Sequence, residues 1–456
     1  MAKPSIPQGM RDFSHDVVRK RNYILSNIRS VFELYGFEPL ETPAMENLDT
    51  LMGKYGEEGD KLIFKVLNNG LNNPKHLDKA KAGFEKLLEG KSSTELTERA
   101  LKYDLTIPFA RYVAMNHGKL VFPYRRYQVQ PVWRADRPQK GRYREFTQCD
   151  ADVVGSVSLL NELELANIYH KVFNNLGLWD YELKINSRKI LTALSDLCGG
   201  ANKMIDITIA IDKLDKIGLD KVKEELLQRE LTTEQVNIIE NYLSIMGSNE
   251  EKLAGIQSLI GHLEKGRQGI GEITYIVEHA KGINLEIDFT LARGLNYYTG
   301  IIFEVKAPPQ VQMGSIGGGG RYDDLTGLFD LPGIPGVGIS FGVDRIYDVL
   351  EELSLFPEKV QSGTTAIFFN MGEKESLFAF DIMQNLRNNG ISCELYHEAV
   401  KINKQFSYAE RKKIQYAIII GSKEIEQNYC LVKNLATGLQ EVVVFDNLPG
   451  YFTKPI

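Results

Sequence analysis

Residues 125–155 read RRYQVQPVWRADRPQKGRYREFTQCDADVVG, and their pattern predicts two strands joined by a loop. Aromatic and basic residues alternate along much of the stretch, with the period of two that is typical of a β-strand. The alternation is interrupted by DRPQKGRY at residues 136–143, where proline and glycine are typical of a loop.

The same segment concentrates positive charge. Residues 125–144 hold seven basic side chains and one acid, Asp136, so their net charge is +6. Six of the seven are arginines, whose planar guanidinium groups suit bidentate contacts with phosphates and stacking on bases. The alternative is a solvated basic hairpin, which is the usual role of a charge run. The arginine content favours phosphate recognition over that alternative.

The rest of the chain does not share this charge. The whole chain has 54 Lys and Arg against 60 Asp and Glu, a net charge of −6. Residues 190–272 carry 9 basic and 14 acidic side chains, and residues 364–456 carry 10 of each. Any binding of nucleic acid should therefore be local, salt-sensitive and discriminating.

Length and composition exclude several classes of protein. The 456 residues suffice for two to four domains of about 100–200 residues each. Hydrophobic residues make up 43% and charged residues 25%, which is typical of globular proteins rather than disordered ones. No apolar run approaches the roughly 20 residues that span a bilayer, and MAKPSIPQGMRDF has no signal-peptide core. We expect a soluble cytoplasmic protein without a membrane partner.

Metal and disulfide chemistry is not indicated either. The four cysteines form no C-x-x-C pair and the seven histidines show no H-E-x-x-H spacing. We therefore expect reduced thiols and no metal ion bound by protein ligands alone.

Periodicity divides the chain into segments. Residues 16–35 show helical spacing before Gly36, and residues 70–95 are polar and turn-rich, which predicts a surface excursion. Residues 190–272 have helical texture with few aromatics and are interpreted as an insertion between 1–189 and 273–355.

Beyond a linker near residues 356–365, short apolar runs alternate with helical patterns. This alternation is the βαβ signature of a parallel sheet with helices on its faces. Residues 364–456 are therefore predicted to form a separate α/β domain.

The common glycine-rich nucleotide-binding motifs are not found in the sequence. Gly90-Lys91-Ser92 resembles the end of a P-loop, but Glu85 occupies the position of its first glycine. The glycines of GVGISFGVDR, residues 336–345, have the wrong spacing for a dinucleotide turn.

Two further motifs remain ambiguous when each is taken alone. LARGLNYYTG contains Arg293 after an apolar segment, which suits either a cavity floor or an edge strand. GGGG at residues 317–320 predicts a glycine-rich turn, which either is flexible or lets the backbone approach a ligand.

Taken in order, these segments resemble the histidyl-tRNA synthetases, a family of class II aminoacyl-tRNA synthetases. The shared strings are QGMRDF, FEPLETP, LKYDLTIP, WRADRPQKGRYREFTQCDADVVG, LARGLNYYTG, GGGGRYDDL and GVGISFGVDR. The pair LARGLNYY and GGGGRYDD is the part specific to histidine.

The resemblance implies an α+β catalytic domain with a mixed, mainly antiparallel sheet. It also implies a helical insertion, a C-terminal α/β anticodon-binding domain and a homodimer formed through the Pro43 segment. The implied reaction uses ATP and Mg²⁺ to convert L-histidine to histidyl-adenylate. The histidyl group then passes to the 3′ end of tRNA(His).

Roles for the ATP site follow from the same resemblance. Arg134 would hold the α-phosphate, Arg142 the outer phosphates, and Phe146 would stack on adenine. Arg345 would cover the other adenine face or the γ-phosphate. Asp136 belongs to the same site. Arg134 and Arg293 would be the catalytic residues, and Arg293 would contact both the histidine carboxylate and the α-phosphate.

Roles for the amino-acid site are implied in the same way. Asp104 and Thr106 match positions that hold the α-amino group, and Gln148 matches a position that binds the amino-acid backbone. Asp152 stands where a carboxylate meets the imidazole. It is shorter than the glutamate of many bacterial members, so its contact is either direct or through water.

Tyr298 would contact the other ring nitrogen, with Tyr297 beside it, and Arg134 and Arg293 complete the histidine-binding set. Asn296 replaces an aspartate of the family string and receives no catalytic role.

The principal alternative is a catalytically inactive, synthetase-like regulatory paralog that binds histidine. Such relatives typically lose the arginine of LARGLNYY and the C-terminal domain, and this chain retains both. A synthetase for threonine or proline would lack the histidine-specific pair. In the C-terminal domain, KINKQFSYAERKK at residues 401–413 has a net charge of +4 and is either a tRNA-facing surface or a solvated helix face.

Overall fold

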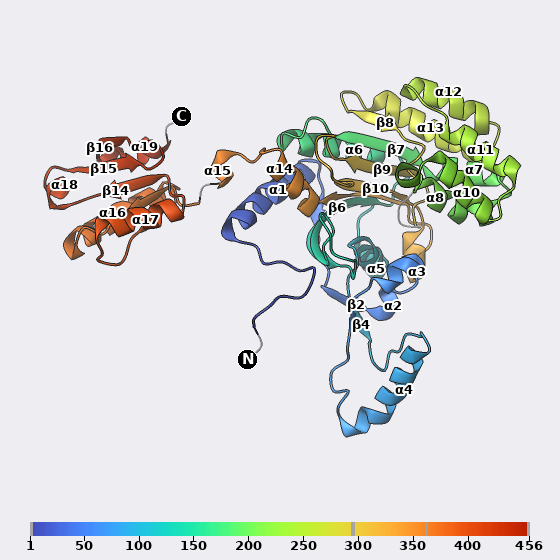
Figure 1. The fold of residues 1–456 in the computed structure, drawn as a ribbon, viewed down its shortest axis with the longest axis horizontal. Coiled ribbons are helices and arrows are strands. Elements are labelled where there is room, and N and C mark those ends of the chain that lie inside the picture. Colours follow the sequence, from blue (N-terminus) through green and yellow to red (C-terminus); the bar gives the residue numbers. More distant parts are fainter. Residues whose placement is uncertain (1–2, 293–296, 362, 454–456) are drawn as a thin grey trace. The chain divides into compact units, whose positions relative to one another are not determined.

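The computed structural model describes residues 3–292, 297–361 and 363–453 (Figure 1). The chain forms two compact units. The first contains residues 1–12 and 21–355, and the second contains residues 13–20 and 356–456. In the described residues, no helix has the length and apolar character needed to cross a membrane.

The first unit is built around an eight-stranded sheet. Its strands, in spatial order, are β1 (Glu38–Pro39), β5 (Tyr124–Trp133), β6 (Glu145–Val154), β11 (Gly336–Gly342), β10 (Gly317–Tyr322), β9 (Ile301–Lys306), β7 (Glu182–Ser187) and β8 (Leu285–Ile287). The pairs β1–β5 and β7–β8 are parallel and the other neighbours are antiparallel. The prediction of a mixed, mainly antiparallel sheet is confirmed, and β5 and β6 are the two strands expected around the loop.

The strand alternation gives this sheet one apolar face and one polar face. Phe341 of β11 lies on the apolar face, with its ring 5.8 Å from that of Phe32 and 4.8 Å from that of Tyr169. These partners belong to α1 (His15–Leu34) and α6 (Leu160–Asn175), and α14 (Val343–Glu352) packs on β6 and β11. The predicted helix over residues 16–35 is confirmed, and Ile24, Ile28, Val31 and Phe32 are buried in this layer.

A smaller sheet is formed by chain segments that precede and follow the predicted surface excursion. Its strands are β2 (Met45–Asn47), β4 (Arg99–Leu101) and β3 (Lys65–Val66), and helices α2 (Leu48–Leu51), α3 (Gly56–Lys61) and α5 (Thr106–Asn116) lie beside them. Between β3 and β4 the chain extends into a hairpin with α4 (Leu77–Leu88), which projects from the body (Figure 1). Most of α4 is exposed, as expected for a surface excursion.

A run of helices separates β7 from β8 and gathers at that edge of the large sheet (Figure 1). The helices are α7 (Arg188–Leu197), α8 (Met204–Ile211), α9 (Leu214–Ile217), α10 (Leu219–Gln228), α11 (Thr233–Leu243), α12 (Asn249–Ile260) and α13 (Glu264–His279). The helical region is thus slightly longer than residues 190–272, because α13 continues until the turn before β8.

The second unit contains a five-stranded sheet and helices on its faces. The strands, in spatial order, are β13 (Cys393–Leu395), β12 (Ala366–Phe368), β14 (Tyr416–Ile419), β15 (Tyr429–Asn434) and β16 (Gln440–Val444). These helices are α16 (Glu373–Asn388), α17 (Ile402–Arg411), α18 (Ser422–Glu426) and α19 (Leu448–Thr453), and the short helix α15 (Glu358–Gln361) lies in the segment that precedes β12. The α/β prediction is confirmed.

The expectation of a parallel sheet holds only for the first three strands of this unit. β12 runs parallel to β13 and β14, but β15 and β16 are antiparallel to their neighbours. A parallel connection needs a crossover of about a dozen residues or more, and the chain between β14 and β15 is shorter than that.

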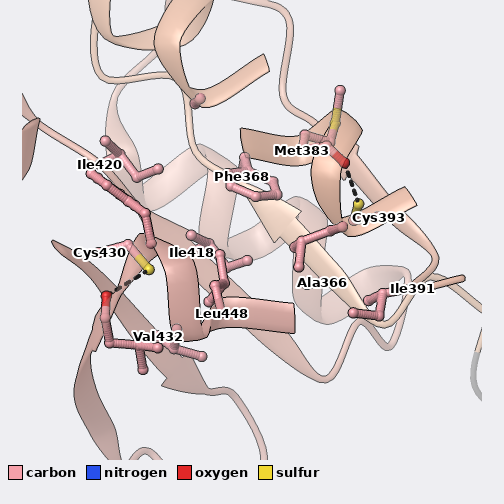
Figure 2. Packing of buried hydrophobic residues seen from close by; sticks show 14 of the residues in the cluster. Ala366, Phe368, Met383, Ile391, Cys393, Ile418, Ile420, Cys430, Val432 and Leu448 are labelled. Carbon is pink, nitrogen blue, oxygen red and sulfur yellow. Dashed lines mark hydrogen bonds between the residues drawn. The ribbon is translucent and has the colours of Figure 1, made fainter. Parts of the chain in front are cut away.

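Two cysteines belong to the core of this second unit (Figure 2). Cys393 and Cys430 lie among Phe368, Ile418 and other buried apolar residues. The Cys430 Sγ donates to the carbonyl of Val443 at 3.4 Å, and burial raises the pKa of its thiol to about 12. All four cysteines of the chain are buried and free, and they pack as small apolar side chains.

Candidate active site

The polar face of the eight-stranded sheet carries two adjoining cavities. The larger has a volume of about 530 Å³ and the smaller about 60 Å³. Gln148, Gly318 and Ser340 line both cavities and therefore mark their junction. A ligand in one cavity can thus reach a ligand in the other at these residues.

Strand periodicity explains why the site forms here. Phe146, Gln148, Asp150 and Asp152 alternate along β6, so their side chains share one face. Ser340 of β11 pairs with Asp150 and Gly318 of β10 pairs with Ser340, so both stand on that same face.

The larger cavity brings together the described residues that were predicted to bind ATP. Its lining includes Arg134, Asp136, Arg142, Phe146 and Arg345. Arg134 donates from Nε to the carbonyl of Tyr103 at 3.1 Å, which orients its guanidinium group along the cavity wall. That group lies 4.3 Å from the Tyr103 ring centre and 5.1 Å from the Phe146 ring centre.

Backbone carbonyls hold Arg345 in place. Its Nε donates to the Gly141 carbonyl at 2.8 Å and its Nη1 to the Ser315 carbonyl at 2.6 Å. The bond to Gly141 attaches the loop between β5 and β6 to the start of α14. Arg142, on the same loop, is exposed on the cavity wall, where an outer phosphate could reach it.

A buried carboxylate anchors the N-terminal segment beneath this cavity. Asp344 accepts from Arg11 and from Arg21 at 2.5 Å each, and from the backbone N–H of Thr147 at 3.2 Å. The arginine of the QGMRDF string therefore supports the cavity floor, a role that the sequence reasoning did not assign.

The smaller cavity gathers the described residues that were predicted to bind histidine, apart from Arg134. Its side-chain lining includes Asp104, Thr106, Gln148, Asp150, Asp152, Tyr297, Tyr298 and Tyr322. Asp150 and Tyr322 were not predicted. The period of two in QCDAD could have indicated Asp150, because it places Gln148, Asp150 and Asp152 on one face.

Four buried acceptor oxygens in this lining have no hydrogen-bond partner among the described residues. They are Asp104 Oδ2, Gln148 Oε1, Asp150 Oδ1 and Asp152 Oδ2, and the last of these lies 2.9 Å from Nη2 of Arg126 as an ion pair. Asp104 Oδ1 already accepts from the Tyr55 hydroxyl at 2.9 Å and from the Ile107 N–H at 3.1 Å. Because an unpaired buried acceptor is costly, the cavity is suited to a small ligand rich in N–H donors.

Burial also changes the acidity of these groups. It raises the pKa of the Asp104 carboxyl, which the Ile107 N–H and the Arg134 charge act to lower. It raises the pKa of the Asp150 carboxyl to about 7, with Arg126 acting in the opposite direction. Positive charge on a ligand would therefore be stabilised in this cavity.

Asp152 is contacted by protein groups at both oxygens. The Tyr322 hydroxyl donates to Oδ1 at 2.5 Å, and Nη2 of Arg126 lies 2.9 Å from Oδ2. Arg126 is fully buried, with its guanidinium 4.1 Å from the Phe109 ring centre. Gly338 faces Asp152 across the strands, and a Cβ at that position would overlap the carboxylate.

The glycine run forms a strand, so the prediction of a turn was wrong. Gly317–Tyr322 is β10, and its glycines pair with β9 on one side and β11 on the other. Bonding on both edges holds these glycines extended despite their conformational freedom. A Cβ on Gly318 would meet only the Phe303 carbonyl, at 3.3 Å, so the missing side chain keeps the cavity junction open.

The arginine of GGGGRYDD has a structural role. Arg321 and Glu162 of α6 are both buried and form two hydrogen bonds, of 2.5 and 2.8 Å. This pair ties α6 to β10 and thereby positions Tyr322 against Asp152. Arg293, Gly294, Leu295 and Asn296 lie outside the described residues.

Comparisons with known proteins agree with this arrangement. A family model described as histidyl-tRNA synthetase matches residues 86–346, and one described as an anticodon binding domain matches residues 366–454. A protein of Flavobacterium johnsoniae named histidine–tRNA ligase is 50% identical, with 98% of each chain covered.

Solved structures give the same result. A histidyl-tRNA synthetase from Nostoc sp. PCC 7120 is 30% identical, with a TM-score of 0.83 and 99% of each chain covered. A second structure is described as an ATP phosphoribosyltransferase regulatory subunit/histidyl-tRNA synthetase from Bacillus halodurans. It is 22% identical, with a TM-score of 0.72, and the match covers 91% of this chain and 99% of that chain, so it shares the fold. The first family model spans more than half of the chain and the relatives span nearly all of it. This chain therefore belongs to the histidyl-tRNA synthetase family.

Proposed function

We propose that this protein uses ATP to activate L-histidine and transfers the histidyl group to the 3′ end of tRNA(His). The observation that carries the proposal is the junction of the two cavities at Gln148. The larger cavity has the arginines and aromatic rings that a nucleoside triphosphate needs. The smaller has buried acceptor oxygens without a hydrogen-bond partner, which suit an amino acid with an ammonium group and a ring N–H.

The first step joins the two ligands at this junction. A carboxylate oxygen of histidine bonds to the α-phosphorus while the bond from that phosphorus to the β-phosphate oxygen breaks, and pyrophosphate leaves. Such transfers depend mainly on positioning and on neutralising charge. Arg134 is oriented for this role by the Tyr103 carbonyl. Arg293 is proposed as the second cation on the same phosphate, from the family resemblance.

The remaining ATP roles are proposed on the lining of the larger cavity. Phe146 would stack on adenine, Arg142 would contact the outer phosphates and Arg345 would cover the opposite side. Mg²⁺, when bound, supplies positive charge to the phosphate oxygens. The carboxylate of Asp136 on the cavity wall offers the oxygen ligand that Mg²⁺ prefers alongside phosphates.

Histidine recognition is proposed for the smaller cavity. Asp104, Thr106 and Gln148 would hold the α-amino group and the amino-acid backbone, while Tyr297 and Tyr298 would face the ring. A site that pairs buried polar groups with its substrate rejects analogues that lack those groups by roughly 10⁴–10⁵. Such discrimination would make a separate editing site unnecessary.

The second unit is proposed to bind tRNA. The family model for an anticodon-binding domain supports this assignment. Lys401, Lys404, Arg411 and Lys413 are exposed along and just beyond α17, whereas Lys412 is paired with Glu394 at 2.8 Å. We also propose a cytoplasmic homodimer formed through the Pro43 segment, next to the edge strand β1.

Amino-acid-dependent exchange of pyrophosphate into ATP tests the proposal directly. Exchange that requires histidine and is not supported by threonine or proline is the expected result. Exchange with another amino acid would contradict the histidine assignment. Absence of exchange with every amino acid would favour the regulatory alternative.

A further inference from the structure

A tyrosine behind the two cavities contacts a residue of each. Tyr55 directly precedes α3 and is 6% exposed, and the described lining of neither cavity includes it. Its hydroxyl donates to Asp104 Oδ1 at 2.9 Å, and its ring centre lies 4.5 Å from that of Tyr103. Asp104 lines the smaller cavity and Tyr103 lines the larger one. Tyr55 is therefore placed to influence both substrates without touching either.

We propose that Tyr55 is a positioning residue for both substrates of the first reaction step. Its hydroxyl fixes the orientation of the Asp104 carboxylate toward the amino acid. Its ring supports the Tyr103 ring, against which the guanidinium group of Arg134 lies. The proposal rests on the proposed function and deepens it, because it names a residue that holds the two binding groups in place.

The hydroxyl controls Asp104 because both donors to that carboxylate use the same oxygen. Oδ1 accepts from Tyr55 and also from the Ile107 N–H at 3.1 Å, whereas Oδ2 has no hydrogen-bond partner among the described residues. The terminal torsion of an aspartate side chain is broad, so the backbone bond alone constrains the carboxylate weakly. With both donors on Oδ1, Oδ2 stays available for a ligand donor such as the α-ammonium group of histidine.

The ring of Tyr55 supports the larger cavity from behind. Tyr55 and Tyr103 belong to one buried apolar cluster. The Arg134 guanidinium lies 4.3 Å from the centre of the Tyr103 ring, and Arg134 Nε also donates to the Tyr103 carbonyl. Aromatic pairs at such a distance are stabilised beyond their burial, so the Tyr55 ring restricts the movement of Tyr103 and thereby of the arginine that rests on it.

A glycine allows Tyr55 to occupy this place. A Cβ on Gly59 of α3 would lie 2.4 Å from the Cβ of Tyr55, so α3 can pack over the tyrosine only because residue 59 has no side chain. The carbonyl of Leu62, the residue after α3, accepts from the Ala135 N–H at 2.8 Å. Leu62 also lines the larger cavity, so these contacts fix the Tyr55 segment against the cavity wall.

Tyr55→Phe, which removes only the hydroxyl, is tested in histidine-dependent pyrophosphate exchange with the full-length protein. A hydrogen bond to a charged group corresponds to about 10- to 150-fold in an equilibrium. Because Asp104 keeps its bond from Ile107, the lower end of that range applies, and the KM for histidine should rise about 10-fold. The kcat and the KM for ATP should stay within about twofold of wild type, because binding lost equally in the ground and transition states changes only KM.

Tyr55→Leu also removes the ring and tests the second half of the proposal. It should raise the KM for ATP as well, by about fivefold, in line with the contribution of one aromatic pair. Thermal unfolding midpoints of every variant show whether the protein is folded at the assay temperature.

Tyr127→Phe is the matched control. Tyr127 is 7% exposed, and its hydroxyl donates to a carboxylate oxygen of Glu33 at 2.7 Å. It lies on the apolar face of the large sheet, where its ring centre is 5.6 Å from that of Phe32. The variant removes the same kind of hydrogen bond outside the site, so both KM values should remain those of wild type.

Two inhibitors give a readout that a structural role would not change. Histidinol keeps the ammonium group of histidine and lacks its carboxylate, whereas imidazolepropionate keeps the carboxylate and lacks the ammonium group. Tyr55→Phe should raise the inhibition constant of histidinol about 10-fold and leave that of imidazolepropionate nearly unchanged, because only histidinol donates to Asp104.

Several results would overturn the proposal. One is a histidine KM within about twofold of wild type in Tyr55→Phe, and another is an equal rise in both inhibition constants. A Tyr55→Phe protein that does not fold would show that the hydroxyl is a structural requirement instead. An unchanged KM for ATP in folded Tyr55→Leu would overturn the role of the ring. Loss of all exchange in wild type would refute the proposed function rather than the role of Tyr55.

Discussion

The Gly318→Ala substitution should change the shape of the active site while leaving the stability of the fold nearly unchanged. Gly318 lies at the junction of the two cavities, on the same sheet face as Ser340. An alanine methyl there would meet only the Phe303 carbonyl, at 3.3 Å, which small movements can accommodate. The strand should therefore form, and the methyl should project into the space that the substrates share.

The expected loss of catalytic activity follows from the small volume of that space. The smaller cavity holds only about 60 Å³, so a methyl at its entrance displaces part of the amino acid. A one-carbon mismatch in a close-fitting pocket is worth about 1–3 kcal/mol, or about 10- to 200-fold in kcat/KM. Replacing glycine by alanine at an unstrained position also reduces the entropy of the unfolded chain, so stability should not fall appreciably.

Two matched glycine variants serve as controls. Gly271→Ala on α13 adds a methyl with no atom within 4 Å and should change neither activity nor stability adversely. Gly319→Ala should damage the fold, because its Cβ would overlap the Gly338 carbonyl of the paired strand. Pyrophosphate exchange and thermal unfolding are measured on all three. A folded Gly318→Ala protein with the kcat/KM of wild type would refute the proposal that the two substrates meet at the junction beside Gly318.

Three further predictions concern charge. Glu162→Gln should lower the free energy of unfolding by about 3 kcal/mol in urea titrations, because it leaves Arg321 buried without its main partner; a loss below about 1 kcal/mol would contradict this. Arg134→Ala and Arg293→Ala should each abolish adenylate formation in a folded protein, and near-normal exchange would remove that arginine from the mechanism. The pKa of Asp150 is raised from 3.8 to about 7, so the native protein should lose stability as pH rises from about 4 to 7, with the full cost present above 7. Asp150→Asn should therefore be more stable than wild type at pH 8, by at most about 4 kcal/mol, and this gain should vanish near pH 4.

Much of the site was predictable because its residues follow one another along a strand. Arg134, Phe146 and Gln148 come from the quoted segment, and strand alternation places Phe146 and Gln148 on the face that forms the cavities. The resemblance to a known family supplied their expected roles. Asp150 belongs to the same segment but was missed, because alternation shows which face a side chain takes and not whether its oxygens are already paired.

The predictions from the sequence were wrong where a segment pairs with strands that lie far from it in the chain. The glycines of β10 were predicted as a turn, since glycine disfavours strands in isolation. Their extended conformation depends on β9 and β11, which bond to both edges. Likewise, Arg126 was counted with the phosphate-binding arginines, yet it is buried against Asp152.

The class of the catalytic fold was inferred from the resemblance to a known family. The sequence by itself determined the pair of strands around a basic loop, the order of segments and the residue types available for chemistry. These are properties of local periodicity and motif spacing, which a linear chain contains in full. Only the tertiary structure decided which arginines reach a cavity, which carboxylates keep a buried oxygen without a hydrogen-bond partner and which glycine opens the junction. Those outcomes depend on pairing between residues far apart in the chain. Burial there makes an unpaired polar atom costly and makes a missing side chain leave open space in the site.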